Sequence, residues 1–532
     1  MNSKRGLWYC VLLQVFGLGF AGWHFRHTLN TDAVAYLRIA SYYAKGQWPL
    51  AVSGYWGPLL SWLMVPFLQL GLPALVAARV VMALSALVFF RGNVAVYRAF
   101  ALPEKWMLTG AWLSALASIY WSVQFITPDL LVSGLICFAA GSMLDGGWLE
   151  TKSAGMKAGL FWGLAYLAKA VAFPLAILVT LAVGGLSFFK GRQSGRGASR
   201  SVLLTLLTFG LVTAPWVLTL SLKYHTPTFS TAGRINQAIV GPPDVERYHP
   251  FARTFHQLEP GRVTSWEDPS PMAYRSWSPF ESVAYARHQF RLIVLHVSTC
   301  LWLLTSLNLF WLVLPGVCAL RLLRPESRAA LVRQPWVHAL FPVALLVLIY
   351  LPFADEQRFF YAAFPFLFTA IALWLIELAG TRPHQSKAIL SGGRWAAVLG
   401  ATAPLVLVGL LIGDSTRLAG DCAHDLARRI QSANLSGPIA GSGLLPGGRT
   451  GLYVAYLLNQ PWYGDEQQPT PESLKTSRAR LIVVNRHSAL AAKLDCDPDF
   501  ENLDAKLFTD ASIAAGFPLK VYQLENRDAV AK

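Results

Sequence analysis

Apolar residues fill long blocks of this chain, from close to the N-terminus to about residue 413, and short polar segments separate the blocks. A helix needs about 20 mostly apolar residues to cross the hydrocarbon core of a bilayer. Blocks of this length predict an all-α domain with many membrane-spanning helices over residues 1–413. The expected spans are 7–23, 72–90, 106–122, 129–147, 155–169, 171–189, 201–222, 291–320, 336–353, 361–380 and 395–413. No small-residue cleavage site follows the first run, which favours an uncleaved span over a signal peptide.

Beyond residue 413 the pattern changes to that of a small α/β domain. Short apolar runs at 438–442, 480–485 and 518–524 alternate with segments of helical character, such as TGLYVAYLLN. Runs of this length rich in β-branched residues are typical of strands. The alternation predicts a compact domain over 414–532.

Two features of this domain invite a ligand-binding interpretation. The glycine-rich stretch GSGLLPGGRTG lacks both the phosphate-binding lysine motif and the spacing of a dinucleotide fingerprint, so it is interpreted as a loop. Asp495, Asp497 and Asp499 alternate, but no glycine turn and no glutamate occur at the spacing of a calcium loop. We therefore expect neither a nucleotide site nor a calcium site in this domain.

Two polar segments of the membrane domain are too long to be simple connectors. In the first, 24–71, apolar residues recur at helical spacing after Asp32, with Tyr36 and Arg38 among them. This pattern predicts an amphipathic helix in the membrane interface, with the acid at its start. The second, 223–290, is rich in Pro, Trp and His and shows no long periodic run. It is either a lid that contacts substrate or a loop that only packs over the membrane domain.

Composition and charge agree with a polytopic membrane protein. The chain is 54% hydrophobic and only 14% charged, with a net charge of +16. The segments 190–200, 321–333 and 381–394 are basic, and all fall on one side when the spans alternate from a cytoplasmic N-terminus. We interpret these cations as orientation signals and do not expect nucleic-acid binding. The same count places the first loop, the long loop and the C-terminal domain on the extracytoplasmic side.

The six cysteines show no metal-binding spacing. Four of them lie in apolar segments and are expected to be buried as small hydrophobic residues. The other two, Cys422 and Cys496, both lie in the C-terminal region. In an oxidising compartment they could pair, and their spacing leaves that question open.

Charged residues that interrupt or end apolar runs are the candidates for chemistry, because an ionisable group at membrane depth is costly. They are Asp32, Arg79, Asp129, Lys169 and Arg358. Lys169 on the extracytoplasmic side fits an anionic headgroup, and the guanidinium of Arg358 can hold a phosphate by two hydrogen bonds.

Each of the later three has a structural alternative. Asp129 follows Pro128 at a helix start, where a carboxylate stabilises the helix dipole without any chemical role. Lys169 could extend its ammonium to the interface. Arg358 could form an internal ion pair with Asp355 or Glu356.

A series of short motifs carries a resemblance to a known family. TDAVAYLRIA, GYWGPLLSWL, AARVVMALSAL, ITPDLLVSGL, GLAYLAKA and EQRFFYAAFPFLF occur in this order over about the first 380 residues. The order resembles that of membrane-embedded GT-C glycosyltransferases that use polyprenyl-phosphate sugars, in the bacterial branch related to protein O-mannosyltransferases and lipid A aminoarabinose transferases. The resemblance covers the C-terminal domain only loosely. It implies a GT-C-like helical fold and transfer of a sugar from a lipid-phosphate donor.

The resemblance extends to individual positions, with two departures. The family's first-loop acid matches Asp32, its proline signature matches Pro58 and the following leucine, its second acid matches Asp129, and its late arginine matches Arg358. Many relatives have a second acid after the first, where this chain has Ala33. Many also have two prolines where this chain has glycine and Pro58. Without the second acid a metal-binding partner is missing, so no required metal is expected.

Glycosyl transfer from a lipid phosphate needs a base for the acceptor hydroxyl and cations for the leaving phosphate. One carboxylate suffices because the phosphate leaves unprotonated, whereas a glycoside hydrolase would show a pair of carboxyls. Direct displacement would invert the anomeric carbon. The expected roles are general base for Asp32, donor phosphate binding for Arg358, Lys169 and Arg79, and substrate contact for Tyr36, Trp56, Pro58, Asp129 and Tyr361.

The expected partners are membrane lipid, a polyprenyl-phosphate sugar and a hydroxyl acceptor on a glycan, lipid or protein, at a bacterial inner membrane. Two other functions stay open. A transporter or flippase also has many helices with a few buried charges, although the two halves of this chain show no inverted repeat. A polymerase or ligase of surface polysaccharide would use a diphosphate-linked saccharide instead, and the sequence does not separate it from a monophosphate-dependent transferase.

Overall fold

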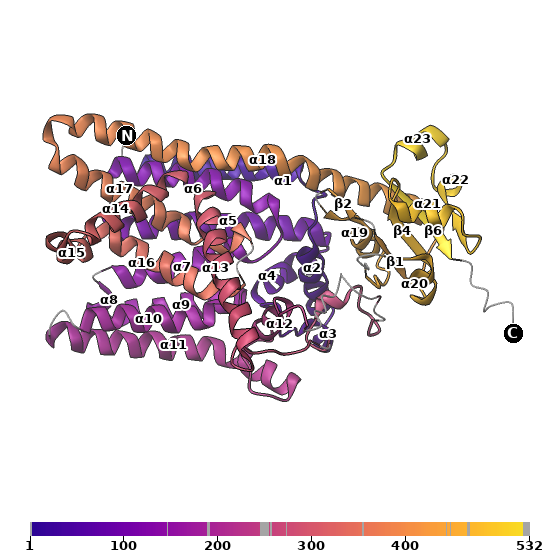
Figure 1. The fold of residues 1–532 in the computed structure, drawn as a ribbon, viewed down its shortest axis with the longest axis horizontal. Helices are drawn as coiled ribbons and strands as arrows, with labels where there is room; N and C mark the ends of the chain where they lie inside the picture. The colour runs from indigo at the N-terminus through magenta and orange to yellow at the C-terminus, as the bar shows by residue number, and fades with distance from the viewer. Residues whose placement is uncertain are drawn as a thin grey trace.

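The computed structural model consists of a long helical bundle joined at one end to a smaller region of mixed helices and strands (Figure 1). It describes residues 3–145, 147–188, 192–244, 255, 258–272, 274–353, 356–442, 444–446, 448–464 and 469–524. The mostly helical architecture with a small C-terminal strand region agrees with the class predicted from the apolar blocks.

The bundle is built from apolar helices that satisfy their own backbone hydrogen bonds, as a membrane requires. Its long members are α1 (Ser3–His24), α5 (Ala74–Ala99), α6 (Glu104–Gln124), α7 (Asp129–Leu144), α9 (Lys152–Ala168), α10 (Ala172–Phe188), α11 (Arg192–Tyr224), α13 (Val283–Thr305), α14 (Val313–Leu322), α16 (Pro335–Tyr350), α17 (Ala363–Thr381) and α18 (Ser386–Ser432). The helices α5 and α7 pack closely. Gly134 permits this approach, because a side chain at that position would collide with the Phe89 backbone of α5.

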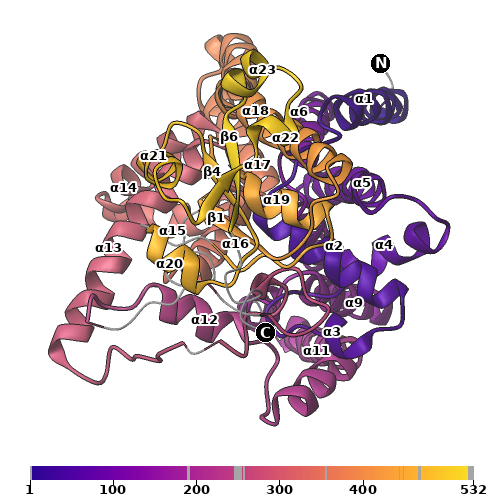
Figure 2. The ribbon, with the colours of Figure 1, turned by 90° about the vertical axis from the view of Figure 1, so that its right-hand side faces the viewer.

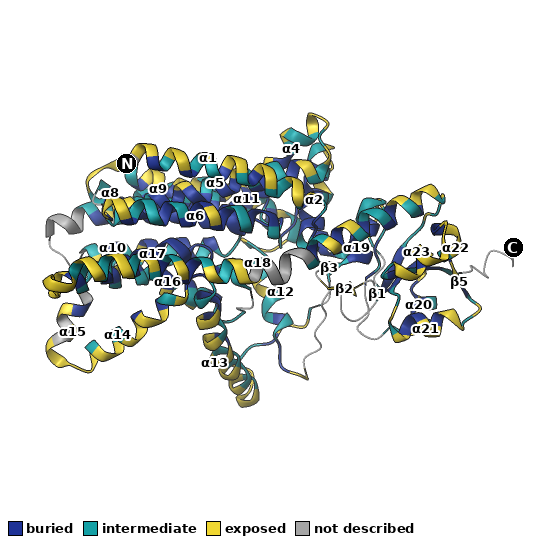
Figure 3. Cartoon of the chain, turned by 90° about the horizontal axis from the view of Figure 1, so that it is seen from above, coloured by how far each residue is buried: buried dark blue, intermediate teal, exposed yellow. Residues whose placement is uncertain are grey.

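Five described helices are long and apolar enough to cross a membrane: Lys4–His24, Ala74–Ala99, Gly197–Tyr224, Ala363–Thr381 and Pro383–Leu407. Several shorter apolar helices accompany them. Large apolar side chains such as Phe20, Leu211 and Trp302 are exposed on the outside of the bundle, where lipid would cover them. Figure 3 shows α13 largely exposed along its length. Most residues of α17, by contrast, are buried. The chain is a multi-pass membrane protein.

Two predicted spans differ from the observed helices. The span expected at 291–320 is divided into α13, the short 3-10 helix η2 (Leu309–Leu312) and α14. The break is at Asn308, whose side-chain oxygen accepts a hydrogen bond from the Phe310 backbone at 3.0 Å and so begins a new helical segment. The span expected at 395–413 lies inside α18, a helix of 47 residues, so the expected domain boundary at 413 falls within one continuous helix.

Short helices lie at the two ends of the bundle. The end opposite the C-terminal region carries α8 (Gly147–Glu150), α15 (Pro325–Val332) and η4 (Pro383–Gln385). Figure 1 shows the N-terminus and α15 at this end. The other end carries α2 (Thr31–Ala44), α3 (Trp48–Ala51), α4 (Leu59–Gln69), α12 (Ala232–Ile239), η1 (Ser265–Glu267) and η3 (Gln357–Phe360).

The helix α2 is covered by protein to a greater extent than its amphipathic pattern predicted. Val34, Tyr36 and Leu37 are buried on it, as are Tyr42 and Tyr43. The helix packs against α4, α5, η1 and the C-terminal region. The rings and cations that gave it an amphipathic pattern are used in protein contacts, for example by Tyr42, which hydrogen-bonds to Glu267.

The C-terminal region contains a four-stranded sheet with the order β1-β4-β6-β5. The pair β1–β4 is parallel and the other pairs are antiparallel. The strands are β1 (Ile439–Ser442), β2 (Leu444–Leu445), β3 (Gly448–Arg449), β4 (Leu481–Asn485), β5 (Phe500–Asn502) and β6 (Leu519–Leu524), and β2 and β3 form a separate hairpin. The helices are α19 (Thr450–Leu457), α20 (Pro471–Thr476), α21 (Ala489–Asp495), α22 (Asp504–Leu507) and α23 (Ala511–Gly516).

The structure gives the state of this region's cysteines and the partners of its alternating acids. Cys422 on α18 and Cys496 after α21 are both free, so they form no disulfide in this structure. The side chain of Lys475 forms ion pairs with Asp497 at 2.8 Å and with Asp499 at 2.7 Å. The third alternating acid, Asp495, pairs with Lys520 at 2.7 Å, so each of these acids has a lysine partner.

Candidate active site

A cavity of about 750 Å³ lies where the bundle meets the C-terminal region. Figure 2 views the molecule from this end, with α19 beside α2. Four charged residues singled out by the sequence line the cavity, namely Asp32, Asp129, Lys169 and Arg358. They come from parts of the chain up to 326 residues apart (Asp32 to Arg358), so the fold brings distant polar positions into one place.

The two acids stand at helix starts. Asp32 is the second residue of α2, and Asp129 is the first residue of α7 after Pro128. A carboxylate in the first helical turn is stabilised by the helix dipole. The segments before the two helices are tied together, since the Asn30 side chain accepts a hydrogen bond from the Ile126 backbone at 2.9 Å.

The two cations are placed by chain segments that leave helical geometry. Lys169 ends α9 in an extended conformation, with φ −152° and ψ 129°. The loop at Gly57 packs on this helix end so closely that an added methyl group would collide with the Ala168 carbonyl. Glycine at position 57 permits this close approach. Arg358 lies in η3, and the neighbouring Gln357 holds that turn by donating to the Ser306 hydroxyl at 2.7 Å.

Ion pairs connect the four residues in a row. Lys169 Nζ lies 2.5 Å from Asp129 Oδ1, and Arg358 Nε lies 3.8 Å from Asp129 Oδ2. Arg358 Nη2 lies 2.8 Å from Asp32 Oδ2 and also donates to Glu356 at 2.6 Å. Buried charges are stable only when paired and hydrogen-bonded, and this row meets that need in large part.

Arg358 keeps capacity for a further acceptor. Its Nη1 is buried and has no hydrogen-bond partner among the described residues. An unsatisfied buried donor on a charged group is costly, and ligand binding is a common explanation for one. A phosphate oxygen is a suitable acceptor, since arginine binds phosphate by parallel hydrogen bonds.

The lining of the cavity has two kinds of surface. Val171, Ile349 and Phe353 contribute hydrocarbon on one part, while Ser230 and Asn236 contribute polar atoms on another. Binding sites for small molecules typically combine an apolar wall with a few placed polar groups. This cavity could hold an amphipathic molecule with a charged headgroup.

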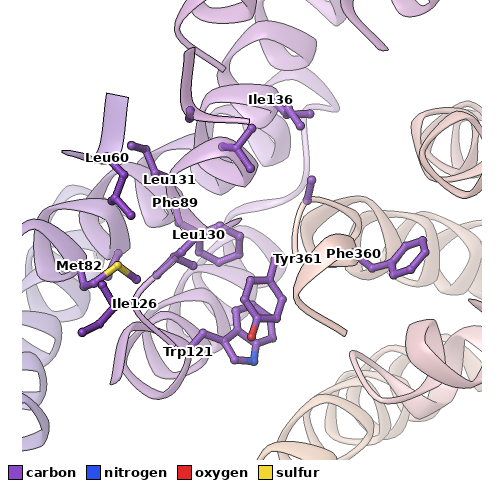
Figure 4. Packing of buried hydrophobic residues seen from close by; sticks show 14 of the residues in the cluster. Leu60, Met82, Phe89, Trp121, Ile126, Leu130, Leu131, Ile136, Phe360 and Tyr361 are labelled. Carbon is purple, nitrogen blue, oxygen red and sulfur yellow. The ribbon is translucent and has the colours of Figure 1, made fainter. Parts of the chain in front are cut away.

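Two residues with expected substrate contacts also line the cavity, and two others do not. Tyr36 and Trp56 are on its wall. Pro58 is buried at the start of α4, next to the lining residue Gly57. Tyr361 is buried against Trp121, with ring centroids 3.9 Å apart and nearly parallel planes, and Figure 4 shows this pair within the apolar core.

Arg79 also does not line the cavity. Its guanidinium donates to the carbonyl oxygens of Phe25 at 2.9 Å, Thr28 at 2.6 Å and Val123 at 3.2 Å. These bonds fasten the backbone segments that precede the two acids. The contacts give Arg79 a role in holding the backbone.

Sequence reasoning assigned no site role to several other lining residues, and three of them come from different parts of the chain. Trp266 comes from the long loop, Glu356 from the segment before η3 and Arg449 from β3 in the C-terminal region. The motif EQRFF contained Glu356 as an ion-pair partner of Arg358, and that alternative is observed. No periodicity or motif marked Trp266 or Arg449, because the contacts that bring them to the cavity are between segments far apart in the sequence.

Metal ligands do not gather in the part of the chain that the structure describes. No group of three or more His, Cys, Asp or Glu side chains is close enough there to hold a metal ion. The acids of the cavity instead face Lys169 and Arg358.

Comparison with known proteins gives a fold but no sequence family. No protein-family model and no curated protein matches the chain. The structure is similar to a crystal structure of ArnT from Cupriavidus metallidurans bound to undecaprenyl phosphate, with 15% identity, 97% coverage of both chains and a TM-score of 0.52. The apo state of ArnT gives a TM-score of 0.51 at the same identity and coverage.

A more distant likeness is to the arabinofuranosyltransferase AftD from mycobacteria, with 13% identity and a TM-score of 0.47 over 98% of this chain and 40% of that one. The ArnT comparison has a TM-score above 0.5 and extends over nearly the whole of both chains. The chain therefore shares the overall fold of ArnT, in agreement with the resemblance carried by the order of its sequence motifs.

Proposed function

We propose that the chain transfers a sugar from a polyprenyl-phosphate donor to a hydroxyl acceptor on the extracytoplasmic side of a bacterial inner membrane. The observation that carries this proposal is the convergence of Asp32, Arg358 and Lys169 on one cavity. The cavity pairs an acid that can accept a proton with cations that can stabilise a leaving phosphate. Its apolar wall suits an isoprenoid chain, and the shared fold with ArnT, crystallised with undecaprenyl phosphate, supports the same class of donor.

In the proposed reaction the donor phosphate binds Arg358, including its unpartnered Nη1, and approaches Lys169. The phosphate competes with Asp32 for the guanidinium, which leaves a carboxylate oxygen available to the acceptor. The acceptor hydroxyl gives its proton to Asp32 while its oxygen bonds to the anomeric carbon. The bond from that carbon to the phosphate oxygen breaks, the electron pair stays on the phosphate, and the configuration inverts.

The proposed orientation follows from the distribution of charge between the two ends of the bundle. The basic segments 321–333 and 381–394 lie at the end that carries the N-terminus, away from the cavity (Figure 1). The positive-inside rule assigns that end to the cytoplasm. The cavity and the C-terminal region then face the other side.

The test is transfer in proteoliposomes supplied with undecaprenyl phosphates that carry a hexose, a pentose or an aminopentose. We expect release of undecaprenyl phosphate in step with sugar transfer to a hydroxyl acceptor. We propose that no metal takes part, so EDTA should leave the rate unchanged. Turnover only with diphosphate-linked saccharides, or movement of a lipid without transfer, would overturn the proposal.

A charge variant tests the phosphate site. Arg358→Gln should raise the KM for the lipid-phosphate donor about tenfold or more, because a bidentate charged contact is lost. The matched control is Arg321→Gln, which breaks a 3.0 Å ion pair with Glu377 away from the cavity. Equal donor dependence in the two variants would count against the role of Arg358.

A further inference from the structure

The indole of Trp266 holds the carboxylate of Asp32. Its Nε1 donates to Asp32 Oδ1 at 3.1 Å, while Arg358 occupies the other oxygen, Oδ2, at 2.8 Å. Trp266 is only 5% exposed and lies in the wall of the cavity. Two donors from separate parts of the chain thus fix the orientation of the same acid.

The turn that carries Trp266 is anchored by the next residue. Glu267 is fully buried and accepts hydrogen bonds from Tyr42 Oη at 2.7 Å, from the Val263 backbone at 2.9 Å and from the Thr264 backbone at 3.2 Å. The side chain of Thr264 caps η1. The backbone of Trp266 is therefore fixed on α2, the helix that carries Asp32.

A second acid anchors the same turn to the end of α11. Asp268 is 5% exposed and forms a 2.8 Å ion pair with Lys223 and a 2.9 Å hydrogen bond with Tyr224. Buried ion pairs contribute little net stability compared with apolar residues of similar size. Two buried acids in succession are better explained by the precise placement of the residue before them.

Trp266 also belongs to a group of aromatic rings on the cavity wall. Its ring centroid lies 4.9 Å from that of Tyr55 and 5.3 Å from that of Trp56, and Trp56 Nε1 donates to the Trp266 carbonyl at 2.7 Å. Tyr36 packs against Trp56 at 5.0 Å. Beside the rings, Tyr55 Oη donates to Asn236 Oδ1 at 3.0 Å.

This wall has the chemistry that recognises a sugar. The C–H groups of a sugar ring carry partial positive charge and pack on the negative face of an aromatic ring. The sugar hydroxyls can exchange hydrogen bonds with neighbouring polar groups such as Asn236. The apolar part of the cavity lacks such polar groups and suits the lipid instead.

We propose that Trp266 is a positioning residue for Asp32 and forms, with Tyr55 and Trp56, the subsite for the donor sugar. The long loop 223–290 is then a part of the active site rather than a cover over the helices. This inference rests on the proposed function, since it names the place of the sugar in that reaction. A change at Trp266 should therefore alter the affinity for a sugar-bearing lipid and leave the affinity for the bare lipid phosphate unchanged.

Binding measurements on the full chain in nanodiscs determine the two affinities separately. The probes are undecaprenyl phosphate and the same lipid carrying a hexose, a pentose or an aminopentose. Wild type should bind one sugar-bearing lipid about tenfold more tightly than the bare lipid phosphate, the scale of one aromatic contact. Trp266→Ala should lose this difference and keep wild-type affinity for the bare lipid.

The positioning role is tested by Trp266→Phe, which keeps an aromatic face and removes the N–H. Its kcat should fall about tenfold, because one hydrogen bond to a charged group is lost, while the donor KM changes less than twofold. The matched control is Trp277→Phe in the same loop, which removes a 2.6 Å bond from Nε1 to the Gln237 carbonyl. A purely structural role would lower the unfolding temperature of both variants and leave kcat per folded molecule unchanged.

The outcomes distinguish this inference from the proposed function. If wild type binds neither lipid and transfers no sugar, the proposed function fails. If wild type transfers sugar while Trp266→Ala keeps the preference for the sugar-bearing lipid, only the sugar subsite is wrong. If Trp266→Phe has wild-type kcat, the positioning role is wrong.

Discussion

The two acids of the cavity, Asp32 and Asp129, occupy similar places on their helices but very different surroundings. Asp129 has a 4% exposed side chain and lies between two cations, Lys169 at 2.5 Å and Arg358 at 3.8 Å. Asp32 has a 15% exposed side chain, one cation and the neutral N–H of Trp266. Asp129, held by two buried cations, is suited to fixing the positions of those cations. Asp32, at the more exposed position, can exchange a proton with a bound molecule.

The largest expected effect is on the more exposed acid. Asp32→Asn should lower kcat about 10³-fold, within the range of a lost general base, because an amide does not accept the acceptor proton. Donor affinity should stay within a few-fold of wild type, since Arg358 and Lys169 remain. The measurements are single-turnover transfer in proteoliposomes and donor binding in nanodiscs.

One outcome for Asp32→Asn would contradict the prediction. Wild-type transfer by this variant would remove the base assignment and, with it, the functional difference between the two acids. Asp421→Asn serves as the control, because Asp421 pairs with His27 at 2.7 Å on the surface of α18 and does not line the cavity. It should transfer sugar at the wild-type rate.

The second prediction concerns the buried acid. Asp129→Asn leaves Lys169 without its 2.5 Å partner. Breaking a buried pair in this way costs about 3–5 kcal/mol of stability, so we expect a clear fall in the unfolding temperature. Transfer should fall by about 10–100-fold through a higher donor KM, because misplaced phosphate ligands weaken binding. Thermal unfolding in detergent and steady-state kinetics measure the two effects.

A double variant separates anchoring from chemistry at this position. Asp129→Asn combined with Lys169→Met removes both charges of the pair, and we expect it to recover much of the unfolding temperature. Transfer should not recover, since Lys169 is a proposed phosphate ligand. If the single variant keeps wild-type stability, Asp129 does not act as an anchor and the contrast with Asp32 is mistaken.

The sequence was sufficient for the general architecture because helical spans follow from the apolar pattern alone. The sequence did not predict the helix boundaries correctly where a side-chain contact ends or extends a helix within an apolar segment. The break at Asn308 depends on a cap to Phe310, and the continuation of α18 depends on packing beyond the membrane. The pattern of α2 was typical of an interfacial helix, yet Tyr42 and its neighbours are buried by protein segments distant in the sequence.

The charged members of the site could be predicted because a charge within an apolar run is conspicuous. That argument finds Asp32, Asp129, Lys169 and Arg358 but cannot tell which charges face the cavity. Arg79 satisfied the same criterion and binds backbone carbonyls instead. Trp266 carries no charge and lies in an irregular loop, so only the structure reveals its contact with Asp32.

The third prediction uses Arg79 to sharpen the comparison between the acids. Arg79 bonds to Thr28, before Asp32, and to Val123, before Asp129, so it fixes the distance between the two helix starts. Arg79→Gln should lower the unfolding temperature by several degrees, because three carbonyl contacts are weakened in a buried place.

Kinetics distinguish a backbone role for Arg79 from phosphate binding. A backbone role predicts a lower kcat of roughly two- to fivefold with an unchanged donor KM, since slight movement of Asp32 affects the reacting geometry. A phosphate ligand would instead raise the donor KM, as expected for Arg358→Gln. A raised KM at wild-type stability would return Arg79 to the phosphate site.

The smallest expected effect is a pH dependence of the unfolding temperature, which arises where the segment after α1 meets α18. This segment is close to Asp32 in the sequence and far from Asp129. The rings of His27 and His424 stack with centroids 4.2 Å apart. Burial lowers the pKa of His424 below 6.5, and His27 and Arg428 act in the same direction, while the Gly420 carbonyl and Asp421 oppose it.

A lowered histidine pKa makes the folded protein favour the neutral ring. The unfolded chain then takes up a proton first as the pH falls through about 6.5, so stability is lost below that pH. We expect the unfolding temperature of wild type to fall by roughly 1–2 °C more between pH 7.5 and pH 5.5 than that of His424→Phe, which has no group to titrate there. Parallel curves for the two proteins would show that the stacked histidines do not couple protonation to the segment that leads into Asp32.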